Sequence, residues 1–253
     1  MSFSMSLCCT SEKNLSENRD LTFLYFFVRI ISTFQGGFME YENKEICSIC
    51  KGKCCKKSGC DYFVSDFDLI NKNELIKALE TGNISIASAF HFKRVGNKDI
   101  VIPILYLRAR NTNRGIIDLY SLKTQCSMLK ESGCSYDLEN RPGGGVNLIP
   151  HKNNACIPLK DPIEEIKKWL PYQNLLAKLV KRYTGKSVEA VIREDVEEVF
   201  YDILTKNFDG VSEAEIRDIT SGISELIKIY PDCYESAKRR KENNQSLILR
   251  REK

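Results

Sequence analysis

The most informative segment of the chain reads Cys47-Ser-Ile-Cys50-Lys-Gly-Lys-Cys54-Cys55-Lys-Lys-Ser-Gly-Cys60, with five cysteines in fourteen residues. Cys47 and Cys50 have the two-residue spacing with which one turn presents two thiolates to a metal ion. Gly52 allows a bend that returns the adjacent Cys54 and Cys55 to the same region. Reduced cysteines can also be buried as small apolar side chains, but a segment rich in lysine and glycine is not a core pattern. The segment therefore predicts metal binding.

The lysines of this segment are open to two interpretations. Positive charge favours thiolate over thiol and offsets the negative charge of a metal–thiolate centre. Lysines that are merely exposed to solvent would give the same pattern. The four lysines are Lys51, Lys53, Lys56 and Lys57.

A second group of cysteines begins at Cys126, and no cysteine lies between Cys60 and Cys126. His91, between two phenylalanines, and His151 are more typical of ordinary core or surface histidines than of ligands. The predicted ligand set has eight thiols, which is enough for two four-thiolate sites, although some thiols would only support the ligands. These cysteines are Cys47, Cys50, Cys54, Cys55, Cys60, Cys126, Cys134 and Cys156. Thiolate sites accept zinc, iron or an iron–sulfur cluster, so the sequence leaves the metal open.

Composition limits the class of protein. The chain has 253 residues, 11 cysteines and a net charge of +4, which is too small to indicate nucleic-acid binding. Cysteines in patches are typical of an intracellular metal or redox protein and not of a secreted disulfide scaffold. We therefore expect a cytoplasmic protein that binds a metal ion and neither nucleic acid nor membrane. A protein partner is left open.

Residues 1–38 are predicted to be a non-native N-terminal extension. The apolar run Leu21–Phe34 is shorter than the about 20 residues that span a bilayer, and Arg29 interrupts it. No small-residue cleavage site follows, as a signal peptide would require. The residues Gln35-Gly36-Gly37-Phe38 can be encoded by a bacterial ribosome-binding sequence just before Met39. We expect translation to start at Met39 in a bacterium.

The rest of the chain is predicted to have an α+β fold in two parts. Residues 39–160 form a small, irregular, cysteine-rich domain organised by metal, and residues 161–253 form a helical extension. In the first part, Ser65 caps a helix with Leu69, Ile76 and Leu79 on one face, and Gly82 ends it. Branched and aromatic residues predict strands at 100–107 and 116–120, joined by a turn at 111–115.

The helical extension is predicted from two apolar stripes with helical spacing. The first stripe ends at Gly210 and contains Val188, Ile192, Val196, Val199 and Ile203. The second begins with a capping box at Ser212 and Glu215, is stopped by Pro231, and contains Ile216, Ile219, Ile223, Ile227 and Tyr230. The basic run 238–241 reads as a solvated helix end, with phosphate binding as the alternative.

The cysteine motifs resemble the YkgJ-type cysteine-cluster family, whose members are described as zinc- or iron-chelating proteins. The resemblance covers about residues 47–156. It rests on the first cysteine segment together with Cys126-x-x-Leu129, Gly133-Cys134-x-Tyr136 and Arg141-Pro142. The family pattern continues Arg-Pro-x-x-Cys-Arg, where this chain has Gly143-Gly144-Gly145-Val146. Either the site has one ligand fewer, or Cys156 replaces the missing one. Arg141 pairs either with a carboxylate or with the negative charge of the centre.

The resemblance also implies an alternative function. The broader cysteine-cluster group includes flagellin lysine N-methylase-like proteins, which are S-adenosylmethionine-dependent enzymes. Such an enzyme needs a glycine-rich nucleotide loop after a strand, and residues 143–145 are the only run of three glycines. That run follows Arg-Pro and no clear strand. The sequence therefore favours a metal-binding protein over a methyltransferase and leaves catalysis uncertain.

Overall fold

A computed structural model describes residues 52, 55–56, 59–95, 98–122, 125–131, 133–137, 139–151, 155–208 and 223–251. Several predictions of the sequence fall outside these residues. They are the extension 1–38 with its start at Met39, the ligands Cys47, Cys50 and Cys54, and the residues Gly210, Ser212, Glu215, Ile216 and Ile219.

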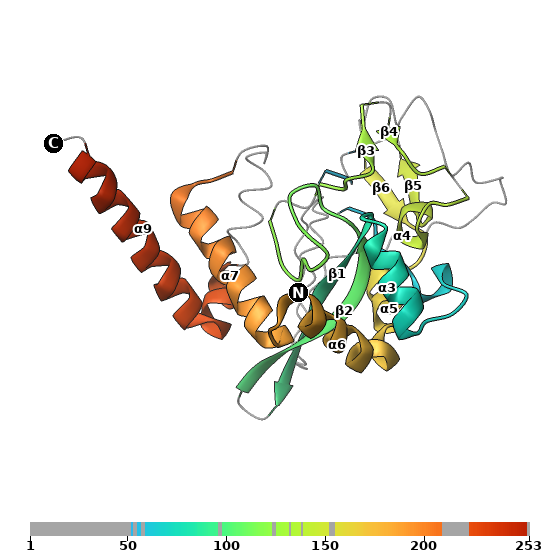
Figure 1. The fold of residues 1–253 in the computed structure, drawn as a ribbon, viewed down its shortest axis with the longest axis horizontal. Coiled ribbons are helices and arrows are strands. Elements are labelled where there is room, and N and C mark those ends of the chain that lie inside the picture. Colours follow the sequence, from blue (N-terminus) through green and yellow to red (C-terminus); the bar gives the residue numbers. More distant parts are fainter. Residues whose placement is uncertain are drawn as a thin grey trace, which may run out of the picture.

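A long antiparallel hairpin runs through the middle of the molecule (Figure 1). Strand β1 (Ile84–Val95) pairs with strand β2 (Lys98–Ala109), from Ile84 opposite Ala109 to Val95 opposite Lys98. The predicted strand at 100–107 lies within β2 and is confirmed. The ribbon carries much of the core, because Ile86, Phe90, Tyr106 and Leu107 are all buried.

The predicted strand at 116–120 is not a regular strand. Ile117 forms a single parallel bridge to Ile86 of β1. The segment stays beside β1 because the Ile86 N–H donates to the carbonyl of Ile116 at 2.8 Å and the Asp118 N–H donates to that of Ile86 at 2.9 Å. One bridge is too short for a ladder, so the prediction of a strand was wrong.

The first helix begins later than predicted. Residues Val64–Asp66 form a short 3₁₀ turn (η1), and helix α3 spans Lys72–Glu80. The side chain of Asn71 caps α3 by accepting from the N–H groups of residues 73 and 74. Leu69 lies outside the helix and is 60% exposed, whereas Leu75 and Leu79 are buried. Gly82, with φ of +83°, follows the helix end as predicted.

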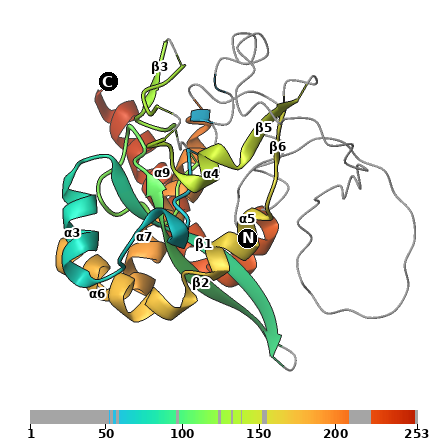
Figure 2. The same cartoon turned by 90° about the vertical axis from the view of Figure 1, so that its right-hand side faces the viewer.

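Two small strand pairs lie at one end of the molecule, away from helices α7 and α9 (Figure 1). Strand β3 (Leu129–Lys130) pairs with β4 (Gly133–Cys134), and β5 (Leu148–His151) pairs with β6 (Ala155–Pro158). A one-turn helix, α4 (Gly143–Val146), precedes β5. Figure 2 shows these pairs near the end of the hairpin where β1 begins and β2 ends.

Helices make up the C-terminal part. They include α5 (Pro162–Lys167), the 3₁₀ turn η2 (Leu170–Tyr172), α6 (Gln173–Thr184), α7 (Val188–Thr205) and α9 (Pro231–Arg251), and residues 223–229 are helical as well. The predicted stripe of α7 is confirmed, because Ile192, Val196 and Val199 are buried. Pro231 starts α9, where a first-turn proline costs no hydrogen bond. The basic run 238–241 lies within α9 and not at its end.

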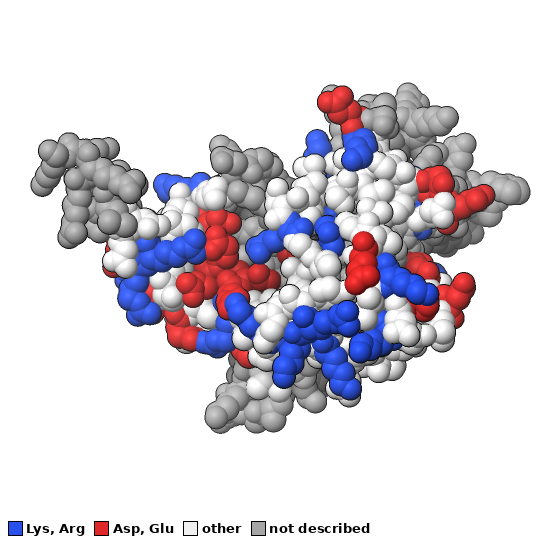
Figure 3. Space-filling model, in the orientation of Figure 1, with Lys and Arg blue, Asp and Glu red and all other residues white. Residues whose placement is uncertain are grey.

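Positive and negative side chains of this part gather over different helices. Figure 3 shows Lys and Arg side chains gathered over α6 and Asp and Glu side chains over α7. Lys186, between the two helices, lies 2.6 Å from the carboxylate of Glu194 on α7. Such an exposed pair stabilises the turn only slightly. No helix among the described residues is long and apolar enough to cross a membrane.

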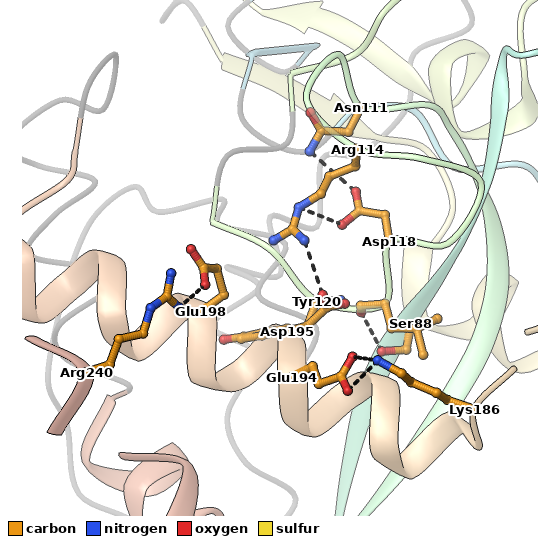
Figure 4. A network of polar contacts seen from close by, with 11 residues as sticks. Ser88, Asn111, Arg114, Asp118, Tyr120, Lys186, Glu194, Asp195, Glu198 and Arg240 are labelled. Carbon is orange, nitrogen blue, oxygen red and sulfur yellow. Dashed lines mark hydrogen bonds and ion pairs between the residues drawn. The ribbon is translucent and has the colours of Figure 1, made fainter. Parts of the chain in front are cut away.

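A buried polar network joins α7 to the loop between β2 and Cys126 (Figure 4). Asp195 accepts a hydrogen bond from the backbone N–H of Tyr120 at 3.0 Å and another from Arg114 at 3.2 Å. The Arg114 guanidinium also lies 3.8 Å from the carboxylate of Asp118, which is 3% exposed. The helical extension is therefore attached to this loop by polar contacts as well as by the core.

One buried cluster contains residues from both predicted parts of the chain. Trp169 is completely buried, and its indole N–H donates to the carbonyl of Tyr62 at 3.0 Å. Gln173 of α6 bonds with both its amide atoms to the backbone of Leu105 in β2. The prediction of an α+β fold with a C-terminal helical part is confirmed, and the strands pair antiparallel, although β1 and β2, with 12 residues each, are longer than the short strands predicted. Organisation of the fold by a metal stays a prediction.

Candidate metal centre

Cys60 and Cys126 come together at the end of strand β2. Both are free thiols, 8% and 2% exposed, and they form one buried cluster with Ala109. The Ala109 N–H donates to the carbonyl of Cys60 at 2.7 Å, and an isolated bridge joins Asn111 to Cys126. The end of β2 thus lies between two cysteines that are 66 residues apart in the chain.

Cys55 and Cys134 lie next to this pair. Cys55 is half-buried against the cluster, and its carbonyl accepts from the N–H of Cys126 at 2.7 Å. Cys134 is exposed on β4, directly opposite Leu129. Gly52 has a φ of +71°, and a Cβ there would lie 2.7 Å from a methyl group of Leu129. Gly52 and Cys55 of the first cysteine segment therefore lie beside Leu129 and Cys126 of the second.

Burial disfavours the thiolate at both central cysteines. It raises the pKa of Cys60 well above its usual value, and Asp61 and the other three thiols raise it further. Burial also raises the pKa of Cys126, whereas hydrogen bonds from the backbone N–H groups of residues 128 and 129 lower it. Those N–H groups favour the thiolate form of Cys126. A bound metal cation that replaces the proton would stabilise the thiolate form, which burial alone disfavours.

The glycine run packs tightly against Cys60 and its neighbours. A Cβ on Gly145 would lie 2.6 Å from the Cys60 sulfur, and one on Gly144 would lie 2.5 Å from the carbonyl oxygen of Asp61. Counting from Arg141-Pro142, Gly145 stands where the Arg-Pro-x-x-Cys pattern has its cysteine. The position that lacks the expected thiol therefore faces a thiol of the cluster directly.

The N–H groups of the glycine run all donate within the protein. Gly143 donates to the carboxylate of Asp66 at 2.7 Å, Gly144 to the carbonyl of Asp61 at 2.9 Å, and Gly145 to that of Pro142 at 2.8 Å. A glycine-rich nucleotide loop needs open space beside its glycines for the ligand, whereas here Phe63, Asp61 and Cys60 fill that space. The run has a packing role here, so it adds no support for a nucleotide site, and methyl transfer stays an untested alternative.

The remaining predicted ligands lie elsewhere or outside the described residues, and the two histidines, which were not predicted as ligands, lie away from the cysteine cluster. Cys156 is half-buried on β6 opposite Pro150, and His151 is on β5 in the same hairpin. His91 is seven residues along β1 from Ile84, the partner of Ala109. That separation is about 20 Å along the ribbon. Within the part of the chain that the structure describes, no three His, Cys, Asp or Glu side chains are grouped closely enough to hold a metal ion.

Two features of the site were missed from the sequence. The hydroxyl groups of Tyr62 and Tyr136 lie 2.7 Å apart, and both tyrosines pack against the cysteine cluster. Arg108 of β2 lies beside Asp61, with 3.2 Å between the Nε and carboxylate oxygen atoms. Tyr62 could have been noticed from its place two residues after Cys60. Arg108 carries no local signal, because only the pairing of β2 with residue 61 brings it to the site.

Comparisons with known proteins do not add to this picture. No protein-family model matches the chain. Neither the curated proteins nor the solved structures give a significant match.

Proposed function

We propose that this protein binds zinc or iron, either as single ions or as an iron–sulfur cluster, through its clustered cysteines. The observation that carries the proposal is the shared burial of Cys60 and Cys126, with Cys55 packed against them. A packing role alone would leave the two thiols among apolar side chains. Here a third thiol, that of Cys55, and the two hydrogen-bonded tyrosines Tyr62 and Tyr136 pack against them, beside Ala109 and Met128.

The chemistry of the donor set fits these metals. Thiolates are soft ligands that select zinc, copper(I) and iron–sulfur centres. Cys60 and Cys126 would hold the metal from the protein interior, and a third thiolate would come from Cys55 or Cys134 only after these side chains move closer, since no three of the described side chains are grouped for a metal. Cys47, Cys50 and Cys54 would complete the set from outside the described residues, with Cys156 as a further candidate. A metal held in this way would cross-link distant segments and so contribute to folding.

The same chemistry suggests where the protein works. Reduced thiols persist in the cytoplasm, where disulfides are rare. We place the protein in the bacterial cytoplasm, with a metal ion as its ligand and with a structural, storage, sensing or delivery role.

The test is the metal and acid-labile sulfide content of the full chain, purified without oxygen, together with a visible spectrum. We expect stoichiometric zinc, or iron with sulfide and a brown colour. Cys60→Ser and Cys126→Ser should lose most of the metal. Cys233→Ser is the matched control, since Cys233 is also a buried free thiol but lies in α9. Equal metal content in all three variants, or no binding by the reduced wild-type protein, would overturn the proposal.

A further inference from the structure

We propose that Cys55 and Cys126 form a reversible disulfide when the protein meets a peroxide. The bond would link the first cysteine segment covalently to the loop that follows β2. This inference goes beyond the proposed metal binding and does not depend on it, because it needs two thiols within bonding reach and no metal ion.

The backbones of the two cysteines are joined directly. The Cys126 N–H donates to the carbonyl of Cys55 at 2.7 Å. In paired strands such a hydrogen bond goes with a Cα separation of about 5.5 Å, and disulfides have Cα separations of about 4.4–6.8 Å. Three residues away on each side, Gly52 lies close against the side chain of Leu129. The two segments are therefore held at a spacing that a disulfide can bridge without movement of the backbone.

The side chains of the two cysteines pack into the same cluster. Cys126 is 2% exposed and forms a buried group with Cys60 and Ala109, and the half-buried Cys55 packs against that group. Both residues are present as thiols. A disulfide needs neighbouring backbones and side chains that are directed to the same place. Cys55 and Cys126 meet both conditions.

Cys60 is the other thiol of the cluster, but its sulfur faces a different element. The Cys60 thiol donates to the carbonyl oxygen of Pro142 at 3.9 Å. A Cβ on Gly145 of α4 would lie 2.6 Å from the same sulfur. A disulfide to Cys60 would require its side chain to leave this contact with the glycine run. The geometry therefore favours the bond between Cys55 and Cys126.

The exposure of the two thiols sets the order of the reaction. Because Cys55 is half-buried and Cys126 is 2% exposed, a peroxide reaches Cys55 first. The Cys55 thiolate attacks a peroxide oxygen, the O–O bond breaks, and a sulfenic acid and one water form. Cys126 then attacks the sulfenic sulfur, the S–S bond forms, and the leaving hydroxide takes the thiol proton as a second water. Two thiols are thus oxidised by two electrons while one peroxide is reduced, and a dithiol reductant reverses the change.

The experiment is tryptic peptide mapping by mass spectrometry on the full chain, treated with hydrogen peroxide in the presence of a metal chelator. Peptide 124–130 contains Cys126 as its single cysteine, and peptide 54–56 contains Cys55. We expect these two peptides to be joined in most chains and to separate on addition of dithiothreitol. Peroxide treatment in urea should lose the preference for this pair, because the folded geometry selects it.

Four variants assign the link to single residues. Cys55→Ser and Cys126→Ser should each abolish it. Cys54→Ser is the matched control, because Cys54 shares a tryptic peptide with Cys55, and it should keep the link. Cys60→Ala should keep the link as well. A link that persists in Cys55→Ser, or that disappears in Cys54→Ser, would overturn the inference.

The wild-type map decides even where a variant does not fold. Unlinked peptides after peroxide treatment, or peptide 124–130 joined instead to peptide 58–72 with its Cys60, would overturn the inference. Metal content is measured separately on the untreated protein. A chain that binds zinc or iron but forms no such link would overturn this inference alone. A chain that forms the link and binds no metal would overturn only the proposed function.

Discussion

The carboxylate of Asp195 on α7 lies 3.2 Å from the guanidinium of Arg114, in the loop that leads from β2 to Cys126. Burial nevertheless raises the pKa of Asp195 from 3.8 to about 6, although Arg114 and the N–H groups of Tyr120 and Leu119 lower it. Desolvation thus exceeds the attraction, and the ionised Asp195 opposes folding.

The first prediction concerns the pH dependence of stability. The pKa of Asp195 is higher in the folded state, so this carboxyl adds to the free energy of unfolding. That stabilisation is fully present below about pH 4 and is lost as pH rises through about 6. In Asp195→Asn this pH-dependent decrease in the free energy of unfolding, of up to about 3 kcal/mol, should be absent. Urea unfolding between pH 4 and pH 7 measures it. Glu194→Gln, at an exposed neighbour, should keep the wild-type pH dependence, and an Asp195→Asn curve parallel to wild type would contradict the prediction.

The second prediction uses the close approach of the glycine run to the cysteine segment. In Gly144→Ala the new Cβ would meet the backbone oxygen of Asp61 at 2.5 Å, and backbone cannot move aside cheaply. We expect a loss of about 1–3 kcal/mol in the free energy of unfolding. Gly115→Ala is the control, because nothing lies within 4 Å of its Cβ position. Chemical denaturation compares the two, and equal midpoints would show that α4 does not pack as described.

The helices of the extension were predictable because their signal is local. The stripe of α7 repeats every three or four residues, and burial of one helix face is enough to explain it. The start of α3 was not predictable for a non-local reason. Asp66, the residue after the predicted cap Ser65, accepts hydrogen bonds from the N–H groups of Phe63 and Gly143. A partner 77 residues away leaves no mark in the local pattern.

Strand β1 and the surroundings of the cysteines were missed for the same kind of reason. Ser85 and Ser88 interrupt the apolar pattern of β1, and their hydroxyl groups donate to the carbonyls of Gly115 and Leu119. The cysteine patches were visible as spacings in the sequence. The pairing of Arg108 with Asp61 depends on strand register, which no single segment contains.

The third prediction concerns the two tyrosines beside the cysteines. A hydrogen bond of 2.7 Å between the hydroxyl groups of Tyr62 and Tyr136 should contribute about 1 kcal/mol to stability. Tyr62→Phe and Tyr136→Phe should each lower the free energy of unfolding, and the double variant should cost less than their sum. A double-mutant cycle by urea unfolding measures this coupling. Strict additivity would mean that the two hydroxyl groups bond to other partners.

The fourth prediction links metal to stability. If zinc binds only the folded chain, the free energy of unfolding should rise by about 1.4 kcal/mol for each tenfold increase in free zinc above the dissociation constant. Urea unfolding of the reduced full chain at buffered zinc concentrations measures this slope. Cys126→Ser should flatten it, because Cys126 is one of the two buried thiols of the cluster. Cys233→Ser should keep it, even though loss of a buried side chain lowers stability at every zinc concentration. A flat wild-type curve would mean that zinc does not hold the cysteine segments together.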